Sequence, residues 1–564
     1  MKKNIFAVLA ACFLIILSIQ FTKAATRNWI GTTTSNDFSV ASNWHEGVVP
    51  IAGDVVQVGV SYKPKNTLVL STAGTTSIGS LTFGTDYNTA IAIGITVNSG
   101  STLSVTGDIT FEINSSISAS SSYNISGGGT ITANNMYIDA SGFSLGALFT
   151  FYQTVNCSIN SLVLSGNMSL TSEIFLLFPQ IAYFNLTAGT TEIDGNITTN
   201  NTINIIGLAY PPSYVVISPS SAAGATLQLN GATALSGLSS SGTNYITFNN
   251  TYATVNYAGT SQTVYTNTAA NVSGGISYYN LIATGSSTKT VASGTLTVSN
   301  NLTLAPPTTA LTFDLNANST ISAIGNFTSN TLSTLIQGSG QNFVVSGTAT
   351  NNGVINLVGN STMFFNGTTG LTNTGTINQL SVSTISAGGP ITNSGTINKS
   401  YGLFLATAGY TNSTGGVFNG TTITGTAGYT YITSAYLNNG TLTCNAETIY
   451  FGGNYTNNNI FTAGTGMVYF SASAPTLVDN STPGTLFNNV TFNGAGTATI
   501  TSGTGNFAVS TIGSLYMVSP AKLVAGTTTA GGAAYLTLMS GASSTATAYT
   551  PSGTTISGNV NVQR

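Results

Sequence analysis

Residues 373–378 read Asn-Thr-Gly-Thr-Ile-Asn, and residues 393–398 read Asn-Ser-Gly-Thr-Ile-Asn. Four related segments flank this pair, and they begin at Asn351, Thr414, Asn438 and Asn457. The third position of the six segments falls at Gly353, Gly375, Gly395, Gly416, Gly440 and Asn459. A recurrence of roughly 20 residues that drifts by a few positions is typical of a solenoid, whereas an array of immunoglobulin-like domains would recur at about 100 residues.

The letters of the repeat have a physical reason. One turn of about 20 residues cannot bury an apolar face alone, but stacked turns can, because each strand pairs with its equivalent about 4.8 Å away. Gly or Asn at the third position suits a tight turn with positive φ, and Asn side chains in register can form amide ladders. The fifth position is always apolar and is expected to point inward, at Ile355, Ile377, Ile397, Phe418, Leu442 and Phe461. The sequence therefore predicts an all-β fold, a right-handed parallel β-helix with coils of about 20–24 residues and an N-terminal cap.

Composition agrees with this architecture. Only 4% of the residues are charged, against about 25% in typical soluble proteins. The chain nevertheless contains 25 Tyr and 26 Phe, so it has the apolar material that a disordered chain lacks. Gly, Asn, Thr and Ser are abundant, while the helix-favouring charged residues are scarce, which favours strands joined by many turns.

The N-terminus predicts the compartment. Lys2 and Lys3 precede an apolar stretch at residues 5–19, and a small-residue cleavage site follows at Ala24. This pattern indicates a secretory signal peptide at residues 1–24, because the apolar core of about 15 residues is shorter than the roughly 20 that span a membrane. We expect a secreted or cell-surface protein with no membrane span after cleavage.

The remaining chain divides into four parts. Residues 25–58 form a cap, and residues 59–254 form irregular coils with larger loops. Residues 255–467 form regular repeats, and residues 468–564 form a second related block that could be truncated. Both tryptophans, Trp29 and Trp44, lie in the cap and are large enough to cover an open solenoid end. The second block is inferred from a duplication, because residues 278–285 match residues 487–494 at a constant offset.

The segment after Ala24 also carries a family resemblance. Residues 28–31 read Asn-Trp-Ile-Gly, and residues 38–44 end in Asn-Trp. Residues 47–55 contain Pro50 and, four residues later, Asp54-Val55. This pattern resembles the start of large secreted β-strand-repeat surface proteins of the Bacteroidetes, which are similar to autotransporter and haemagglutinin-type β-helices. The resemblance implies a β-helical adhesin or structural protein of the cell surface. Such chains often end in a C-terminal sorting domain that the sequence before Arg564 lacks, so we expect a truncated sequence.

Charge limits the partners. Loss of residues 1–24 removes three lysines and leaves seven basic against thirteen acidic side chains, a formal net charge of −6. Without a basic patch, nucleic acid and anionic membranes are not expected partners. Cys157 and Cys444 could be two buried thiols or one disulfide, and the sequence leaves that open. Metal-ligand spacings of Cys and His are absent, and no cofactor is predicted.

Catalytic groups are scarce. His45 is the only histidine, and residues 195–446 contain only three charged residues, Lys289, Asp314 and Lys399. The one candidate catalytic pair is Glu192 and Asp194, which share a face of a strand because they lie two residues apart. Two such carboxylates could perform acid–base work on a glycosidic bond, but a solvated strand end or turn is the simpler interpretation of the pair.

These observations predict a non-catalytic surface structural protein or adhesin that binds glycans or other surfaces weakly and multivalently through its repeats. Two alternatives stay open. One is a polysaccharide-active hydrolase or lyase on the same scaffold, which would need carboxylates gathered from distant coils. The other is a passive stalk for a missing C-terminal domain. The oligomeric state is not predicted.

Overall fold

The computed structural model of the chain describes residues 24–84, 93–112, 120–141, 151–175, 178–203, 214–217, 224–232, 245–247, 252–266, 276–315, 319–423, 428–482, 484–501, 507–517, 522–525, 536–539, 547–549, 555–558 and 560–563. Within these ranges the fold is all-β, and its only helical turn is a 3-10 turn at Ala41–Asn43. Apart from Ala24, the predicted signal peptide lies outside the described residues.

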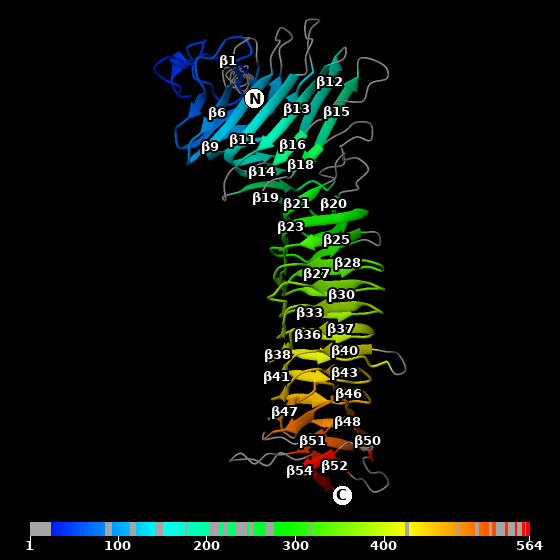
Figure 1. The fold of residues 1–564 in the computed structure, drawn as a ribbon. Helices are drawn as coiled ribbons and strands as arrows, with labels where there is room; N and C mark the ends of the chain where they lie inside the picture. The colour runs from blue at the N-terminus through cyan, green and yellow to red at the C-terminus, as the bar shows by residue number, and fades with distance from the viewer. Residues whose placement is uncertain are drawn as a thin grey trace, which may run out of the picture. The chain divides into compact units, whose positions relative to one another are not determined.

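The chain forms two compact units (Figure 1). The first comprises Met1–Asn185 and Thr198–Ser213, and the second comprises Leu186–Ile197 and Tyr214–Arg564. Each unit stacks parallel strands from successive turns of the chain. The predicted parallel β-helix is therefore confirmed, while its handedness stays a prediction that rests on the strong preference of parallel crossovers for the right-handed form.

In the first unit, one column of paired strands contains β1 (Thr26–Trp29), β2 (Val55–Val58), β5 (Ser80–Phe83), β8 (Ile109–Glu112), β10 (Met136–Asp139) and β12 (Met168–Phe175). Val58 pairs with Phe83 and Phe83 with Phe111, so these coils are longer than the repeats that surround Asn373. The inward rings of Phe83 and Phe111 stack with centroids 4.9 Å apart. An antiparallel hairpin joins the end of β12 to β13 (Phe178–Leu186).

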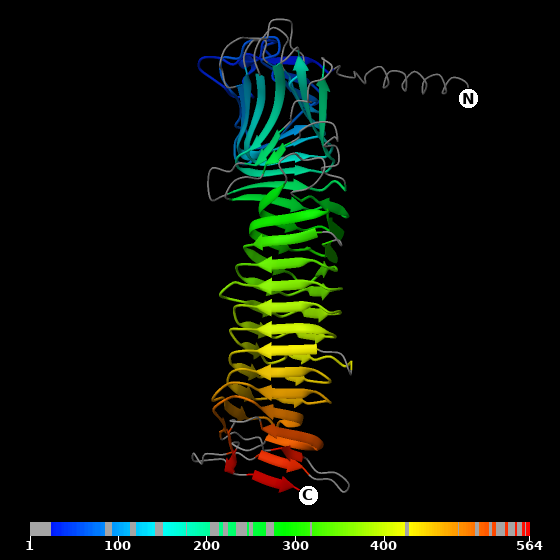
Figure 2. The same cartoon turned by 45° about the vertical axis from the view of Figure 1, so that its right-hand side comes forward.

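In the regular part of the second unit, each coil contributes three strands, and each strand pairs with its equivalent in the next coil, which is three strands later in the chain except for β46 (Met467–Phe470) (Figure 2). The first sheet contains β30 (Val354–Leu357), β33 (Thr376–Gln379), β36 (Thr396–Lys399), β39 (Val417–Asn419), β42 (Thr441–Thr443) and β45 (Ile460–Thr462). The second contains β31 (Thr362–Phe365), β34 (Thr384–Ala387), β37 (Gly402–Ala406), β40 (Gly428–Ile432), β43 (Thr448–Phe451) and β46 (Met467–Phe470). The third contains β29 (Ala349–Asn351), β32 (Leu371–Asn373), β35 (Ile391–Asn393), β38 (Tyr410–Asn412), β41 (Tyr436–Asn438) and β44 (Tyr455–Asn457).

The fifth position of the repeat lies where the sequence predicted. Ile355 pairs with Ile377, Ile377 with Ile397, and the column continues through Phe418, Leu442 and Phe461. The first three side chains are fully buried. Burial of one such side chain contributes about 1.5–3 kcal/mol, so a continuous inward column accounts for much of the coil-to-coil cohesion.

The expectation that the repeat glycines adopt positive φ in a tight turn was wrong. None of Gly353, Gly375, Gly395, Gly416 or Gly440 has positive φ. These glycines are needed because neighbouring coils approach closely. A Cβ on Gly375 would lie 2.0 Å from the carbonyl oxygen of Gly353 in the preceding coil, and a Cβ on Gly395 would lie 2.0 Å from that of Gly375.

The expected amide ladder is present at the first position of the repeat. It runs through Asn351, Asn373, Asn393, Asn412, Asn438 and Asn457, all fully buried. Each Nδ2 donates to the Oδ1 of the next asparagine at 2.7–2.9 Å. In one coil the ladder position is Asn412 rather than Thr414, because the turn between the two strands is longer there.

The two duplicated segments share a local irregularity. β21 (Ser277–Ala283) and β48 (Leu486–Phe492) each pair with a long following strand, β23 (Gly294–Leu304) and β50 (Phe507–Met517). The register shifts between Tyr278 and Asn280 in the first pairing, and between Phe487 and Asn489 in the second. These positions correspond to one another in the duplication, so the repeated sequence coincides with a register shift at equivalent places, which is a one-residue bulge in the first pairing and a longer insertion in the second.

The two tryptophans lie together in the first unit. Trp29 and Trp44 are buried and meet edge to face, with ring centroids 5.1 Å apart. The Arg27–Asp54 ion pair, with N–O 3.0 Å, ties β1 to the segment before β2. That residues 25–58 protect the solenoid end stays a prediction. Cys157 and Cys444 are both buried, and no disulfide joins them.

Candidate functional site

The carboxylate pair singled out in the sequence is brought together by a third residue. Glu192 lies in β14 (Gly189–Ile193) and Asp194 directly follows it. Asn230, which follows β17 (Ala225–Leu229) of the next coil, donates from Nδ2 to Glu192 Oε1 at 2.6 Å and to Asp194 Oδ1 at 2.7 Å. Both acceptor oxygens therefore lie close to one amide nitrogen, as expected for neighbours on one face of a strand.

The same amide belongs to a ladder. Gln228 pairs in register with Glu192 and donates to Asn230 Oδ1 at 3.3 Å, and Asn256 of the following coil donates to Gln228 Oε1 at 3.3 Å. The two carboxylates thus accept hydrogen bonds at one end of a row of side-chain amides. No basic residue occurs between Lys65 and Lys289 in the sequence, so this long stretch supplies none of the cations that a lyase would place beside its carboxylates.

The sequence alone did not single out Asn230. It is far from Glu192 in the chain, and the register of the larger coils in this region decides which asparagine of many lies opposite the pair. Asn230 could be identified from strand pairing only if the length of this coil were already known.

Other titratable groups near the N-terminus hold the local structure. The ring of His45 stacks on Tyr62 with centroids 3.9 Å apart. The adjacent Glu46 accepts hydrogen bonds from the backbone N–H and the side chain of Asn28 at 2.9 and 2.7 Å. Burial acts to raise the pKa of Glu46, but these hydrogen bonds outweigh it and hold the pKa below its ordinary value. His45 thus packs on Tyr62, next to a glutamate that is hydrogen-bonded to Asn28.

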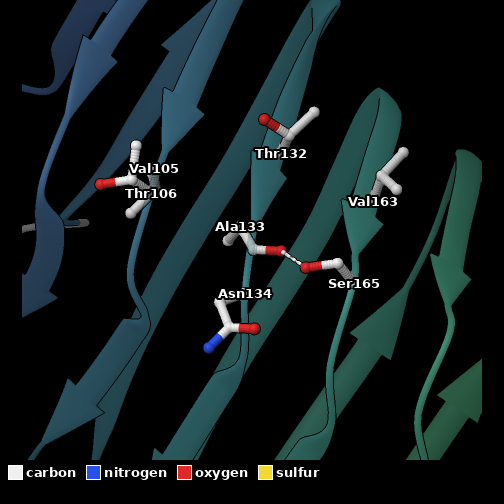
Figure 3. A pocket seen from close by; sticks show the side chains of 7 residues that line it. All are labelled: Val105, Thr106, Thr132, Ala133, Asn134, Val163 and Ser165. Carbon is white, nitrogen blue, oxygen red and sulfur yellow. Dashed lines mark hydrogen bonds between the residues drawn. The ribbon is translucent and has the colours of Figure 1, made fainter.

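The first unit has a shallow pocket of about 340 Å³ at the ends of β7 (Ser101–Val105), β9 (Ser121–Ala133) and β11 (Phe151–Leu164) (Figure 3). The residues that line it are uncharged: Val105, Thr106, Thr132, Ala133, Asn134, Val163 and Ser165. Ser165 Oγ donates to the carbonyl oxygen of Ala133 at 3.4 Å. Neither Glu192 nor Asp194 lines this pocket, and it offers no acid or base for catalysis.

In residues 276–501 of the second unit, burial removes most of the few charges from the surface. Within the described part of residues 276–501 there are five charged side chains: Lys289, Asp314, Lys399, Glu447 and Asp479. Four of them are at most 3% exposed, and only Asp314 is half-buried. The outer surface of these coils consequently consists almost entirely of hydroxyl, amide, aromatic and aliphatic groups.

The buried charges have internal partners. Lys399 Nζ donates to Glu447 Oε1, and also to the carbonyl oxygen of Tyr429 at 2.9 Å. The Thr430 hydroxyl donates to the same carboxylate at 2.9 Å. Burial lowers the pKa of Lys399, although the Glu447 carboxylate opposes that shift. The pair cannot reach a substrate, because both side chains are fully buried.

One outward feature of the second unit is aromatic. Tyr431 in β40 pairs with Tyr450 in β43, and Tyr450 with Tyr469 in β46. Their rings stack, with centroids 4.4 and 4.5 Å apart and planes within 10°. Desolvation and the two neighbouring phenols raise the pKa of Tyr450 to about 12, so its hydroxyl stays protonated at neutral pH. This column was not among the features expected from the sequence.

The sequence does contain a weak signal for it. Outward positions are fixed by alternation once a strand is placed, and Tyr-x-Tyr at residues 429–431 recurs as single tyrosines in the next two coils. Tyr431, Tyr450 and Tyr469 follow one another at equal steps along the chain. Among the many tyrosines of this sequence, that spacing becomes meaningful only after the coil length is known.

The described residues contain no group of three or more His, Cys, Asp or Glu side chains that could hold a metal ion. They also include no helix capable of crossing a bilayer. Comparison of the chain with protein-family models, curated proteins and solved structures gives no match.

Proposed function

We propose that the chain is a secreted, non-catalytic surface protein that binds neutral glycans through the coil surface of residues 276–501 in its second unit. One observation carries the proposal: in the described part of residues 276–501, Asp314 is the only charged side chain that is not buried. A surface with a single partly exposed charge gives little long-range attraction to ionic partners. It presents instead rows of hydroxyl and amide groups, which match the hydroxyl groups of an uncharged polysaccharide.

Repetition strengthens this kind of binding. Equivalent side chains recur about every 4.8 Å along the stack, so a long polymer can contact several coils at once. Individually weak contacts then sum to useful avidity without any deep pocket. The proposal also fits the burial of most charged side chains inside the coils, because their burial leaves the outer surface nearly neutral.

The test uses the full chain and a panel of insoluble polysaccharides, including neutral and anionic ones, assayed for both retention and release of reducing ends. We expect retention on at least one neutral polysaccharide without cleavage. Retention should change little with salt, because few charges are involved. Retention on none of the panel would contradict glycan binding and favour a passive stalk.

A second candidate, a polysaccharide-active enzyme, is favoured by one specific contact. Asn230 holds the carboxylates of Glu192 and Asp194 against a single amide, which places two acidic groups near each other. Release of reducing ends by the wild-type chain that is lost in both Glu192→Gln and Asp194→Asn would establish the enzyme and overturn the non-catalytic proposal. Asp108→Asn is the matched control, because Asp108 is also a carboxylate but accepts its hydrogen bonds from the backbone N–H and the side-chain amide of Asn135.

A further inference from the structure

An apolar and aromatic strip lies on the outer face of the sheet formed by β37, β40, β43 and β46. We call it the tyrosine strip, and it comprises Leu403, Leu405, Tyr429, Tyr431, Tyr450 and Tyr469. Leu405, Tyr431, Tyr450 and Tyr469 form one register column across four coils, and Leu403 and Tyr429 begin a parallel column beside it. These side chains are half-buried to exposed rather than internal, so the strip faces solvent.

The geometry of the rings determines what the strip can contact. Tyr431, Tyr450 and Tyr469 cover one another's faces, so they present ring edges and hydroxyl groups outward. Tyr429 lies outside this stack. Its ring is tilted by 32° from that of Tyr431 and 38° from that of Tyr450, and it is 38% exposed. The strip therefore combines one partly open aromatic ring with a row of phenol hydroxyls, one per coil.

The described residues beside the strip carry no outward charge. The neighbouring outward positions in the two register columns are Thr384, Ser386, Thr448 and Met467. Aromatic surface next to hydroxyl donors suits a ligand that has C–H faces and hydroxyl groups but no ionic group. The rings repeat every 4.4–4.5 Å, one per coil, so a polymer lying along the stack would meet an equivalent phenol in each of three successive coils.

We propose that the tyrosine strip is a binding site for a neutral polysaccharide chain that runs along the solenoid axis. This inference rests on the proposed glycan-binding function and assigns it to particular residues. A contiguous exposed apolar strip of this kind marks an interaction site more often than a random patch of surface does. Because the described outward residues of these four coils are uncharged, the strip offers no cation to an anionic glycan, and we expect it to prefer an uncharged one.

The test compares the full-length chain with two variants of the strip and one control. Tyr429→Ala removes the open ring without entering the stack, and Tyr450→Phe removes a hydroxyl while keeping the stack. Leu380→Ser is the matched control, because Leu380 is 50% exposed on the same unit but lies in a turn outside the sheet. Affinity gel electrophoresis in soluble neutral polysaccharides measures binding, and sedimentation velocity measures self-association.

For a soluble neutral polysaccharide that the wild type binds, we expect Tyr429→Ala to weaken binding by about tenfold and Tyr450→Phe by about threefold, since single stacking contacts are worth on the order of 1 kcal/mol. The control Leu380→Ser should weaken it by less than about twofold. Wild-type binding with both strip variants unaffected would overturn the site while leaving the proposed function intact. No wild-type binding at all would overturn both. Self-association that Tyr429→Ala abolishes would overturn the glycan site and identify the strip as a contact between copies of the chain. Equal binding of anionic and neutral polysaccharides would refute the preference for an uncharged glycan.

Discussion

The side-chain amide nitrogen of Asn373 lies 2.7 Å from the amide oxygen of Asn393, its equivalent in the next coil. Asn373 accepts in turn from Asn351 at 2.7 Å, and both contacts are fully buried. A second ladder runs on the outer surface, where Asn398 donates to Asn378 at 2.9 Å and accepts from Asn419 at 2.8 Å. The same residue type in the same coils thus makes the same contact in two environments, which separates the effect of burial from that of the hydrogen bond.

Asn373→Ala should destabilise the coils by about 1–3 kcal/mol, because it leaves a buried amide oxygen on Asn393 without its donor. Asn398→Ala on the outer ladder should cost less than about 1 kcal/mol, because water replaces the lost partner. Native-state hydrogen exchange of β32 and β35 measures the difference locally, which avoids assuming a single transition for a long repeat array. Equal effects of the two substitutions would refute the argument.

Gly375→Ala should destabilise the same region by about 1–3 kcal/mol, because the added methyl group collides with the carbonyl oxygen of Gly353 and the coils cannot separate without breaking backbone pairing. Gly388→Ala is the control. It also lies outside the positive-φ region, but its Cβ would meet its nearest neighbour at 3.6 Å, an ordinary contact. Thermal unfolding followed by circular dichroism should show a lower transition for the first variant only.

Removal of one member of the buried Lys399–Glu447 pair should be costly. Lys399→Met leaves a buried carboxylate without its cation, and Glu447→Met leaves a buried ammonium without its anion, so each should destabilise by about 3–5 kcal/mol. The double variant should be considerably more stable than the two losses together imply. A double-mutant cycle from urea unfolding gives the coupling, and strict additivity would argue that the two charges are independent.

Lys289 predicts a pH dependence of stability. Its side chain is fully buried, with Nζ donating to the carbonyl oxygens of Gly259 and Thr260, and burial lowers its pKa from 10.5 to about 8. Between these two pH values the unfolded chain binds more protons than the folded one, so the free energy of unfolding rises with pH across that window. The full window corresponds to about 3 kcal/mol as an upper limit.

The measurement compares wild type and Lys289→Met by chemical unfolding from about pH 8 to about pH 9.5, because tyrosine ionisation in the unfolded chain is common to both proteins and cancels in the comparison. The wild-type free energy of unfolding should increase more steeply with pH than that of the variant. Parallel curves for the two proteins would show that the folded-state pKa of Lys289 is close to its ordinary value.

Much of the fold follows from local pattern. The near-identical segments around Asn373 and Asn393 predict coil length, and alternation along each strand predicts that Ile377 and Ile397 face inward in register. The pattern is readable because a β-strand alternates its side chains regularly and a coil must return to the same place to pair with itself. The position of Glu192 beside Asp194 is predictable for the same reason.

Tertiary structure decided what depends on register between coils of unequal length. The ladder passes through Asn412 because a longer turn precedes Gly416, and Asn230 meets Glu192 because of the particular length of one coil. Asn is too common in this chain for sequence spacing alone to identify either partner.

The sequence by itself therefore determined the parallel β-helix, its coil length and the scarcity of charge. Only the tertiary structure decided that Lys399 and Glu447 face inward while Tyr431, Tyr450 and Tyr469 share one outward column. The physical reason is that the inward or outward direction of a side chain is fixed by the strand that carries it, whereas the neighbours it meets are fixed by turn lengths elsewhere in the coil.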